Sequence, residues 1–170
     1  MTYELGPQSL ANITTVDPRL VAVAKLAITL SAQDFGFQVQ QSRTIAEEAI
    51  EVHEGFSHTM HSHHLINDGS LTWEPTPSQV GCSGAVDAVP WVNGGWLWAT
   101  VPPAHQWDYI YEVAWAFRQA SIQLGIPVTW GGLWPKPLAE WPANSAADLK
   151  ALHLKIGGLA DGPHFELGRN

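Results

Sequence analysis

Three short segments, far apart in the chain, carry the residues that most constrain its fold. They are Ser62-His63-His64, Gly84-Ala85-Val86-Asp87 and Asp161-Gly162-Pro163-His164. Two histidines and an aspartate from such segments can hold a zinc ion and leave one coordination position open for water, as hydrolytic zinc sites do. Asp161 precedes His164 closely enough to take a proton from that water. A fold that uses this chemistry must bring the three segments together.

The composition is that of one globular domain. The 170 residues are 45% hydrophobic and 14% charged, so we expect a single domain over residues 1–170 with a sizeable core. The net charge of −8 argues against nucleic-acid and anionic-membrane partners, because phosphate contacts need Lys and Arg. The single cysteine, Cys82, cannot form an intrachain disulfide, and we expect it to be an inert thiol.

Hydrophobic periodicity and turn residues predict helices and short strands in mixed order. Asn93-Gly94 is a strong turn signal, so residues 91–98 are expected to form a hairpin. Such a mixture indicates an α+β domain with a small antiparallel sheet and flanking helices. Helices are expected from Asp17-Pro18 to Leu30, from Ile45 to Gly55, from Pro103 to Gly125 and from Asn144 or Ser145 to His153, and strands at 35–39, 85–89, 126–130 and 164–167.

Two stretches before the second candidate segment carry possible site residues. Arg43 falls at a strand-to-helix junction, where it could face a cleft or form a surface salt bridge with Glu47 or Glu48. Residues 53–64 hold five histidines, a tract that fits metal binding but also a solvated loop, so most of them are not expected to be ligands. Residues 66–83 are polar and rich in Gly and Pro, and we expect a long loop that acts as a mobile flap beside the cleft.

Taken together, the motifs resemble one family: the zinc D-Ala-D-Ala carboxypeptidases and dipeptidases and the L-alanyl-D-glutamate peptidases, above all the phage endolysin branch. The resemblance covers nearly the whole chain, and its most specific parts are Ser62-x-His64, Gly84-x-Val86-Asp87 and Asp161-x-x-His164. Weaker matches extend over residues 9–20, 35–44 with its Arg-Thr pair, and 90–95.

The resemblance implies a role for each matched residue. It makes His64, Asp87 and His164 the zinc ligands and Asp161 the catalytic base. Arg43 would stabilise the substrate carbonyl, and Ser62 would contact the substrate. The chain departs from the family in one place, because the family keeps its first histidine close to the aspartate, whereas here residues 65–86 intervene. His61 is therefore the alternative first ligand.

The same resemblance implies a function. It is a zinc-dependent peptidoglycan peptidase that hydrolyses a stem-peptide bond, first of all L-alanyl-D-glutamate, for host cell lysis. Such a protein would be a monomer made in the host cytoplasm without a signal peptide, acting in the periplasm once the membrane is permeabilised. Its partner would be the stem peptide, with no nucleic acid and no membrane. The alternatives are a D-Ala-D-Ala carboxypeptidase or dipeptidase, and a zinc-stabilised, non-catalytic cell-wall-binding domain, which the presence of Asp161 disfavours.

Three further residues bear on the site. Asp87 lies in an apolar strand, where a buried carboxylate needs a partner, and a metal ion would supply one. Glu166 shares a strand face with His164, so it could support the site or simply be solvated. Of the nine tryptophans we expect most to be core, with Trp130 the best candidate to line a substrate cleft.

Overall fold

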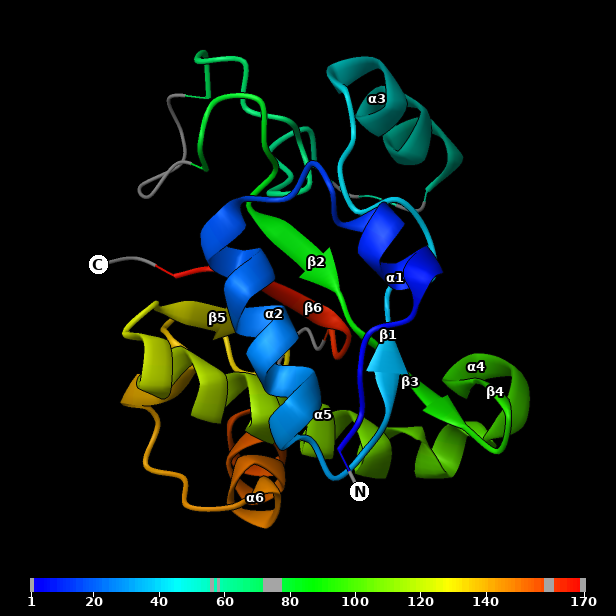
Figure 1. Ribbon diagram of the computed structural model, residues 1–170, viewed down its shortest axis with the longest axis vertical. Helices are drawn as coiled ribbons and strands as arrows, with labels where there is room; N and C mark the ends of the chain where they lie inside the picture. The colour runs from blue at the N-terminus through cyan, green and yellow to red at the C-terminus, as the bar shows by residue number, and fades with distance from the viewer. Residues whose placement is uncertain (1, 56, 58, 72–77, 158–160, 169–170) are drawn as a thin grey trace.

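The computed structural model describes residues 2–55, 57, 59–71, 78–157 and 161–168 (Figure 1). They form an α+β domain, as the sequence predicts. Its helices are α1 (Pro7–Asn12), α2 (Pro18–Leu30), α3 (Ile45–Glu54), α4 (Leu97–Thr100), α5 (Pro103–Leu124), the 3₁₀ helix η1 (Leu138–Glu140) and α6 (Ala146–Ile156). Its strands are β1 (Phe35–Gly36), β2 (Ala85–Asp87), β3 (Val89–Val92), β4 (Gly95–Trp96), β5 (Val128–Trp130) and β6 (His164–Leu167).

Two small antiparallel sheets lie at the centre of the domain. One has the strand order β2-β6-β5 and the other β1-β3-β4, and the chain passes from the first to the second between Asp87 and Val89. In the first sheet Asp87 lies directly opposite His164. This register brings two of the candidate ligands together although 77 positions of sequence numbering separate them.

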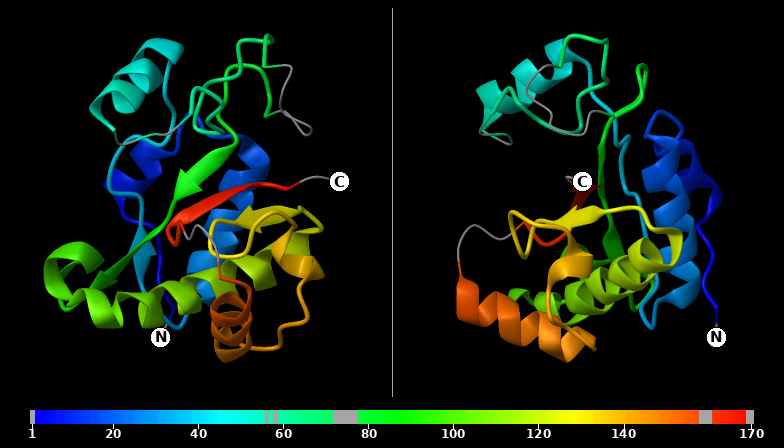
Figure 2. Two further views of the ribbon diagram at one scale, coloured as in Figure 1. Left: turned by 180° about the vertical axis from the view of Figure 1, so that it is seen from behind. Right: turned by 90° about the vertical axis from the view of Figure 1, so that its left-hand side faces the viewer.

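Helices cover the sheets and complete the core. α2 packs against α5, and α6 packs on the other side of α5, while α3 lies apart at the opposite end of the molecule (Figures 1 and 2). The predicted inner face of α2 is fully buried at Leu20, Val23 and Ala24. Phe117 of α5 stacks on Phe165 of β6, with ring centroids 3.9 Å apart. The longest helix therefore supports the strand that carries His164.

Local signals explain where the elements begin and end. The Asp17 side chain caps α2, accepting a hydrogen bond from the Arg19 backbone N–H at 2.9 Å. Thr44 and Glu47 form the predicted capping box of α3. The predicted hairpin is present between β3 and β4, where Asn93 and Gly94 have φ values of 52° and 80°, as a two-residue turn of this kind requires.

The structure adds two elements that the sequence does not predict, α1 and η1, and differs from the expected elements in other places. The first strand ends at Gly36, and Val39 is 61% exposed, because the chain leaves the sheet there to bring Gln41 into the interior. Residues 97–100 form helix α4 in place of a hairpin strand. The strand expected over residues 85–89 is divided between the two sheets, and it is this division that turns Asp87 towards the β6 strand.

The long loop over residues 66–83 is held at both ends. Asn67 is buried, donates its backbone N–H to Cys82 O at 2.9 Å, and donates its side-chain amide to Ser78 O at 2.6 Å. Residues 72–77, the middle of the expected flap, lie outside the described residues. In the part of the chain that is described, no helix, α5 included, is both long and apolar enough to cross a bilayer.

Candidate active site

Three elements bring the candidate ligands to one point. Asp87 ends β2, His164 begins β6, and His64 lies in a segment paired in parallel with the residues around Arg43. Arg43 donates its backbone N–H to His64 O at 2.8 Å and accepts from Ile66 N at 2.9 Å. His64 is therefore fixed by backbone pairing although it lies outside the regular strands.

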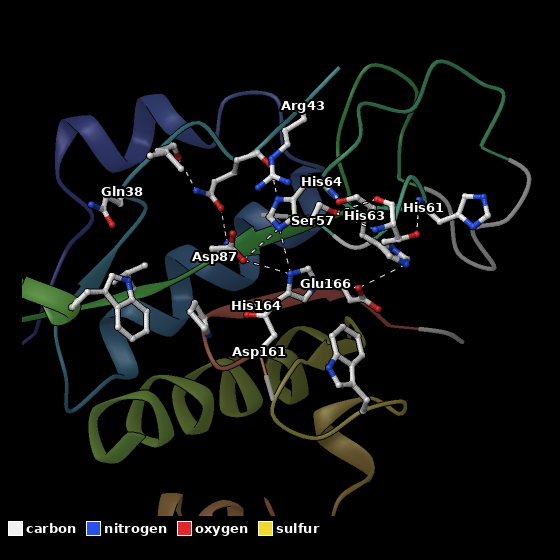
Figure 3. Close-up of a pocket in the computed structure, with 18 residues that line it drawn as sticks. Gln38, Arg43, Ser57, His61, His63, His64, Asp87, Asp161, His164 and Glu166 are labelled. Carbon is white, nitrogen blue, oxygen red and sulfur yellow. Dashed lines mark hydrogen bonds and ion pairs between the residues drawn. The ribbon is translucent and has the colours of Figure 1, made fainter. Parts of the chain in front are cut away.

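The three side chains form a triangle of ligand atoms. His64 Nε2 lies 3.4 Å from Asp87 Oδ1, His164 Nδ1 lies 3.5 Å from the same oxygen, and the two nitrogens are 3.3 Å apart (Figure 3). Ligands bound about 2.0–2.2 Å from a tetrahedral ion are about 3.3–3.6 Å from one another. These residues could therefore hold one metal ion, and among the described residues they are the group that could do so.

Each histidine has its other ring nitrogen occupied. His64 Nδ1 lies 2.7 Å from the backbone carbonyl of Gln41, and His164 Nε2 lies 3.0 Å from Glu166 Oε2. A carbonyl and a carboxylate can only accept, so in each neutral ring the occupied nitrogen carries the hydrogen and the lone pair points into the triangle. This arrangement orients both rings as metal ligands.

The charges around the triangle favour a cation. His164 is buried between Asp87 and Glu166, and although burial acts to lower its pKa, hydrogen bonds to these two carboxylates raise the pKa to about 10. Burial acts to raise the pKa of Asp87, but His64 and His164 outweigh it and hold the pKa well below its usual value. A proton on His164 and a metal ion would therefore compete for the same lone pair.

Asp161 lies in the same cleft and is held by the turn that precedes β6. Its backbone N–H donates to Gly131 O at 3.0 Å, and its carbonyl accepts from His164 N at 3.2 Å. A Cβ atom on Gly131 would overlap the Asp161 carbonyl, so glycine allows this close approach. Desolvation raises the pKa of Asp161, and Asp87 and Glu166 add to the effect while His164 and His64 oppose it.

Arg43 both faces the cleft and forms an ion pair. Its Nη1 lies 3.1 Å from Glu48 Oε2, and its side chain is 26% exposed whereas that of Glu48 is fully buried. Arg43 therefore does both things that the sequence offers as alternatives: it lines the cleft and it forms a salt bridge, with Glu48 and not Glu47 as the partner. Figure 3 shows Arg43 and Asp161 on opposite sides of the three-residue cluster.

The cleft has a volume of about 570 Å³ and includes most of the expected site residues. Ser62 lines it and accepts a 3.3 Å hydrogen bond from the His64 backbone N–H. His61 also lines it, but of the two candidate first ligands only His64 belongs to the triangle found among the described residues. None of the described residues of 66–83 lines the cleft. That wall is formed by Ser57, Thr59, His61, Ser62 and His63.

Trp130 does not line the cleft, contrary to expectation. It is completely buried, and its indole N–H donates to Gly162 O at 2.7 Å, beneath the turn that carries Asp161. The tryptophans at the cleft are Trp98 and Trp134, and the Trp134 ring lies 5.4 Å from that of His164. The sequence does not reveal in which direction the Trp130 side chain points.

Two supporting residues were not assigned from the sequence. Gln41 is buried and contacts both His64 and Asp87. Glu166 contacts His164, which is the first of the two alternatives for this residue, and the strand alternation that places it on the His164 face is the signal. No comparable signal marks Gln41, because its partners lie far along the chain.

Comparisons with known proteins relate the chain to peptidases. The sequence pattern of the family described as phage L-alanyl-D-glutamate peptidase matches residues 1–168. The L-alanyl-D-glutamate peptidase of Escherichia phage T5 is 30% identical over 168 residues, covering 98% of this chain and 99% of that protein. The crystal structure of the Serratia marcescens L-Ala D-Glu endopeptidase ChiX superposes with a TM-score of 0.61 at 29% identity, covering 98% of this chain and 90% of ChiX.

Proposed function

The chain belongs to the phage L-alanyl-D-glutamate peptidase family, and on that premise we propose that it is a zinc-dependent endolysin. It would hydrolyse the bond between L-Ala and D-Glu in the peptidoglycan stem peptide. It would act as a monomer, in the periplasm, after the host membrane is permeabilised. The observation that carries the proposal is the triangle of His64, Asp87 and His164 with Asp161 in the same cleft.

Zinc suits the ligand set better than the common hard cations. Imidazole nitrogens with one carboxylate are typical zinc ligands, whereas calcium and magnesium prefer oxygen alone. When bound, the ion would polarise the scissile carbonyl and lower the pKa of the attacking water. Gln41 and Glu166 would keep the His64 and His164 lone pairs directed at it.

The remaining chemistry is assigned to Asp161 and Arg43. Asp161 would accept the proton of the attacking water and return it to the leaving amine. Its raised pKa suits this task, because an ordinary aspartate is too weak a base. The guanidinium of Arg43 would stabilise the negative charge that develops on the carbonyl oxygen.

The shape of the cleft favours internal cleavage over removal of a terminal residue. Lining residues extend on both sides of the ligand triangle, with Gln38 on one side and His61 and His63 on the other (Figure 3). A peptide can therefore occupy both sides of the scissile bond. A D-Ala-D-Ala carboxypeptidase needs room for only one residue on the carboxyl side of the scissile bond.

Digestion of purified peptidoglycan tests the function directly. The protein should release new D-Glu amino termini and leave L-Ala carboxyl termini on the glycan strand, both identified by mass spectrometry. Release of free D-Ala instead would establish the carboxypeptidase alternative. Intact peptidoglycan in the presence of excess zinc would exclude both activities.

Elemental analysis of variants tests the metal and its first ligand. The wild-type protein should contain about one zinc ion per chain, and His64→Ala should lose it whereas His61→Ala should retain it. The two histidines are neighbours in one segment, so each variant is the control for the other. The opposite result would make His61 the first ligand.

A further inference from the structure

The two ends of the cleft differ in chemistry. Val39, Val89 and Trp98 line one end together with the amide of Gln38. Val39 is 61% exposed and Trp98 is 46% exposed, so apolar surface faces the solvent there. The lining residues described between 57 and 63 are all Ser, Thr or His. Figure 3 shows Gln38 and the pair His61 and His63 on opposite sides of Asp87 and His164.

The apolar end is built on a defined framework. Val39 follows β1, Val89 begins β3, and Trp98 lies in α4 immediately after β4, so all three belong to the β1-β3-β4 sheet and its flanks. Across the hairpin the rings of Trp91 and Trp96 pack edge to face, with centroids 5.0 Å apart. Trp98 therefore follows a hairpin whose two strands are packed together by their aromatic side chains.

The proposed substrate is equally asymmetric. In peptidoglycan the amino group of L-Ala is joined to the lactyl ether of N-acetylmuramic acid, whereas D-Glu continues into a peptide that bears free carboxylates. The sugar lies about two residue lengths, roughly 7 Å, from the scissile carbonyl. The C–H face of a sugar ring can pack on an indole, and its N-acetyl and hydroxyl groups can bond to an amide.

We propose that Trp98, Val39 and Gln38 form a subsite for N-acetylmuramic acid on the amino-terminal side of the scissile bond. The part of the substrate that begins with D-Glu then lies along the Ser, Thr and His residues at the other end of the cleft, where His61 and His63 can donate hydrogen bonds to its carboxylates. This inference rests on the proposed function and adds the direction in which the substrate lies. It also makes the sugar, and not only the peptide, part of what the enzyme recognises.

Two soluble substrates isolate the contribution of the sugar. One is N-acetylmuramoyl-L-Ala-D-Glu-diaminopimelate, and the other is the same tripeptide with a simple N-acetyl group in place of the sugar. The wild-type kcat/KM should be about 10-fold higher for the muramoyl peptide, because burying roughly 60 Å² of apolar surface corresponds to that factor. In Trp98→Ala the ratio of the two kcat/KM values should approach one, and Trp98→Phe should retain part of the advantage.

Leu154→Ala provides the matched control. Leu154 is also an exposed apolar residue, 70% accessible, but it lies on α6 and does not line the cleft. In Leu154→Ala the ratio of the kcat/KM values for the two peptides should equal that of the wild type. Equal wild-type rates on both peptides, or a Trp98→Ala variant that slows both by one factor, would overturn the subsite while leaving the peptidase intact. If the wild-type protein cleaved neither peptide, the proposed function itself would be wrong.

Discussion

The side-chain carbonyl of Gln41 accepts a 2.5 Å hydrogen bond from the backbone N–H of Asp87. The backbone carbonyl of the same residue lies 2.7 Å from His64 Nδ1. One buried residue thus contacts two of the three proposed ligands, which lie in segments far apart in the sequence. The relative position of His64 and Asp87 is set largely through Gln41.

Replacing Gln41 with Met should therefore loosen the metal site without emptying the core. The Asp87 N–H would lose its partner, so zinc affinity should fall about 10–100-fold, the usual effect of removing a supporting residue. The free energy of unfolding of the metal-free protein should fall by about 1–3 kcal/mol. Competition with a chelator measures the first and urea unfolding the second. Gln40→Met, at an exposed neighbouring position, is the control; unchanged affinity in Gln41→Met would show that Gln41 does not set the site.

Gly131→Ala should impair catalysis more than metal binding. The added methyl group would overlap the Asp161 carbonyl and displace the proposed base. A displacement of about 1 Å at a catalytic group can cost on the order of 10²-fold in rate. Gly84→Ala is a suitable control, since the nearest atoms to its Cβ would lie 3.6–3.9 Å away, in ordinary contact. Equal rates in the two variants would argue against the role of the Gly131 contact.

Arg43 should affect stability as well as turnover. Arg43→Met would leave the fully buried Glu48 carboxylate without its ion-pair partner at Oε2. The other oxygen, Oε1, has no hydrogen-bond partner among the described residues. We expect a loss of about 2–3 kcal/mol, less than for a wholly buried pair because Arg43 is partly exposed. The double variant Arg43→Met/Glu48→Gln should recover stability in urea unfolding but not activity. If the double variant recovered activity, Arg43 would have no role in catalysis.

Asp17 should make the fold sensitive to acid. Burial acts to raise its pKa, but hydrogen bonds from the Arg19 side chain and from the backbone of Gln79 and Arg19 outweigh it, and the pKa is lowered. A carboxylate with a lowered folded pKa stabilises the protein above its unfolded pKa of about 3.9 and loses that contribution as the pH falls through the folded value.

Comparison with Asp17→Asn isolates this contribution. The variant keeps a capping side chain but loses the charge, so at neutral pH it should be about 1 kcal/mol less stable. Below about pH 4 the difference between the two proteins should shrink. Urea unfolding across this range measures it. A difference that stays constant, or grows in acid, would contradict the assigned sign.

The parts that could be predicted from the sequence are those with local causes. Caps at Asp17 and Thr44 and the turn at Asn93 depend on neighbouring residues, and their predictions are confirmed. The segments of the proposed ligands were recognisable because each carries its own short motif. That Asp87 lies opposite His164 follows from strand register, which only the folded sheet reveals.

The parts that could not be predicted depend on contacts distant in sequence. Gln41 reads as an ordinary polar residue, because nothing nearby indicates that it will be buried against Asp87. Trp98 and Trp130 both lie at the end of a strand expected from the sequence, yet Trp98 lines the cleft and Trp130 is buried. The cleft wall made of Ser57, Thr59, His61, Ser62 and His63 could not be assigned before the path of the chain after α3 was known.

The zinc content and turnover of Asp161→Asn, measured on one preparation, test whether Asp161 is the base that acts beside a bound zinc ion. Asparagine keeps the shape of the side chain but cannot accept a proton from water. We expect zinc content and thermal stability near the wild-type values and a rate lower by about 10²–10⁴-fold on the muramoyl tripeptide. Loss of zinc would make Asp161 a ligand, and retained turnover would show that another group takes the proton; either result would contradict the mechanism.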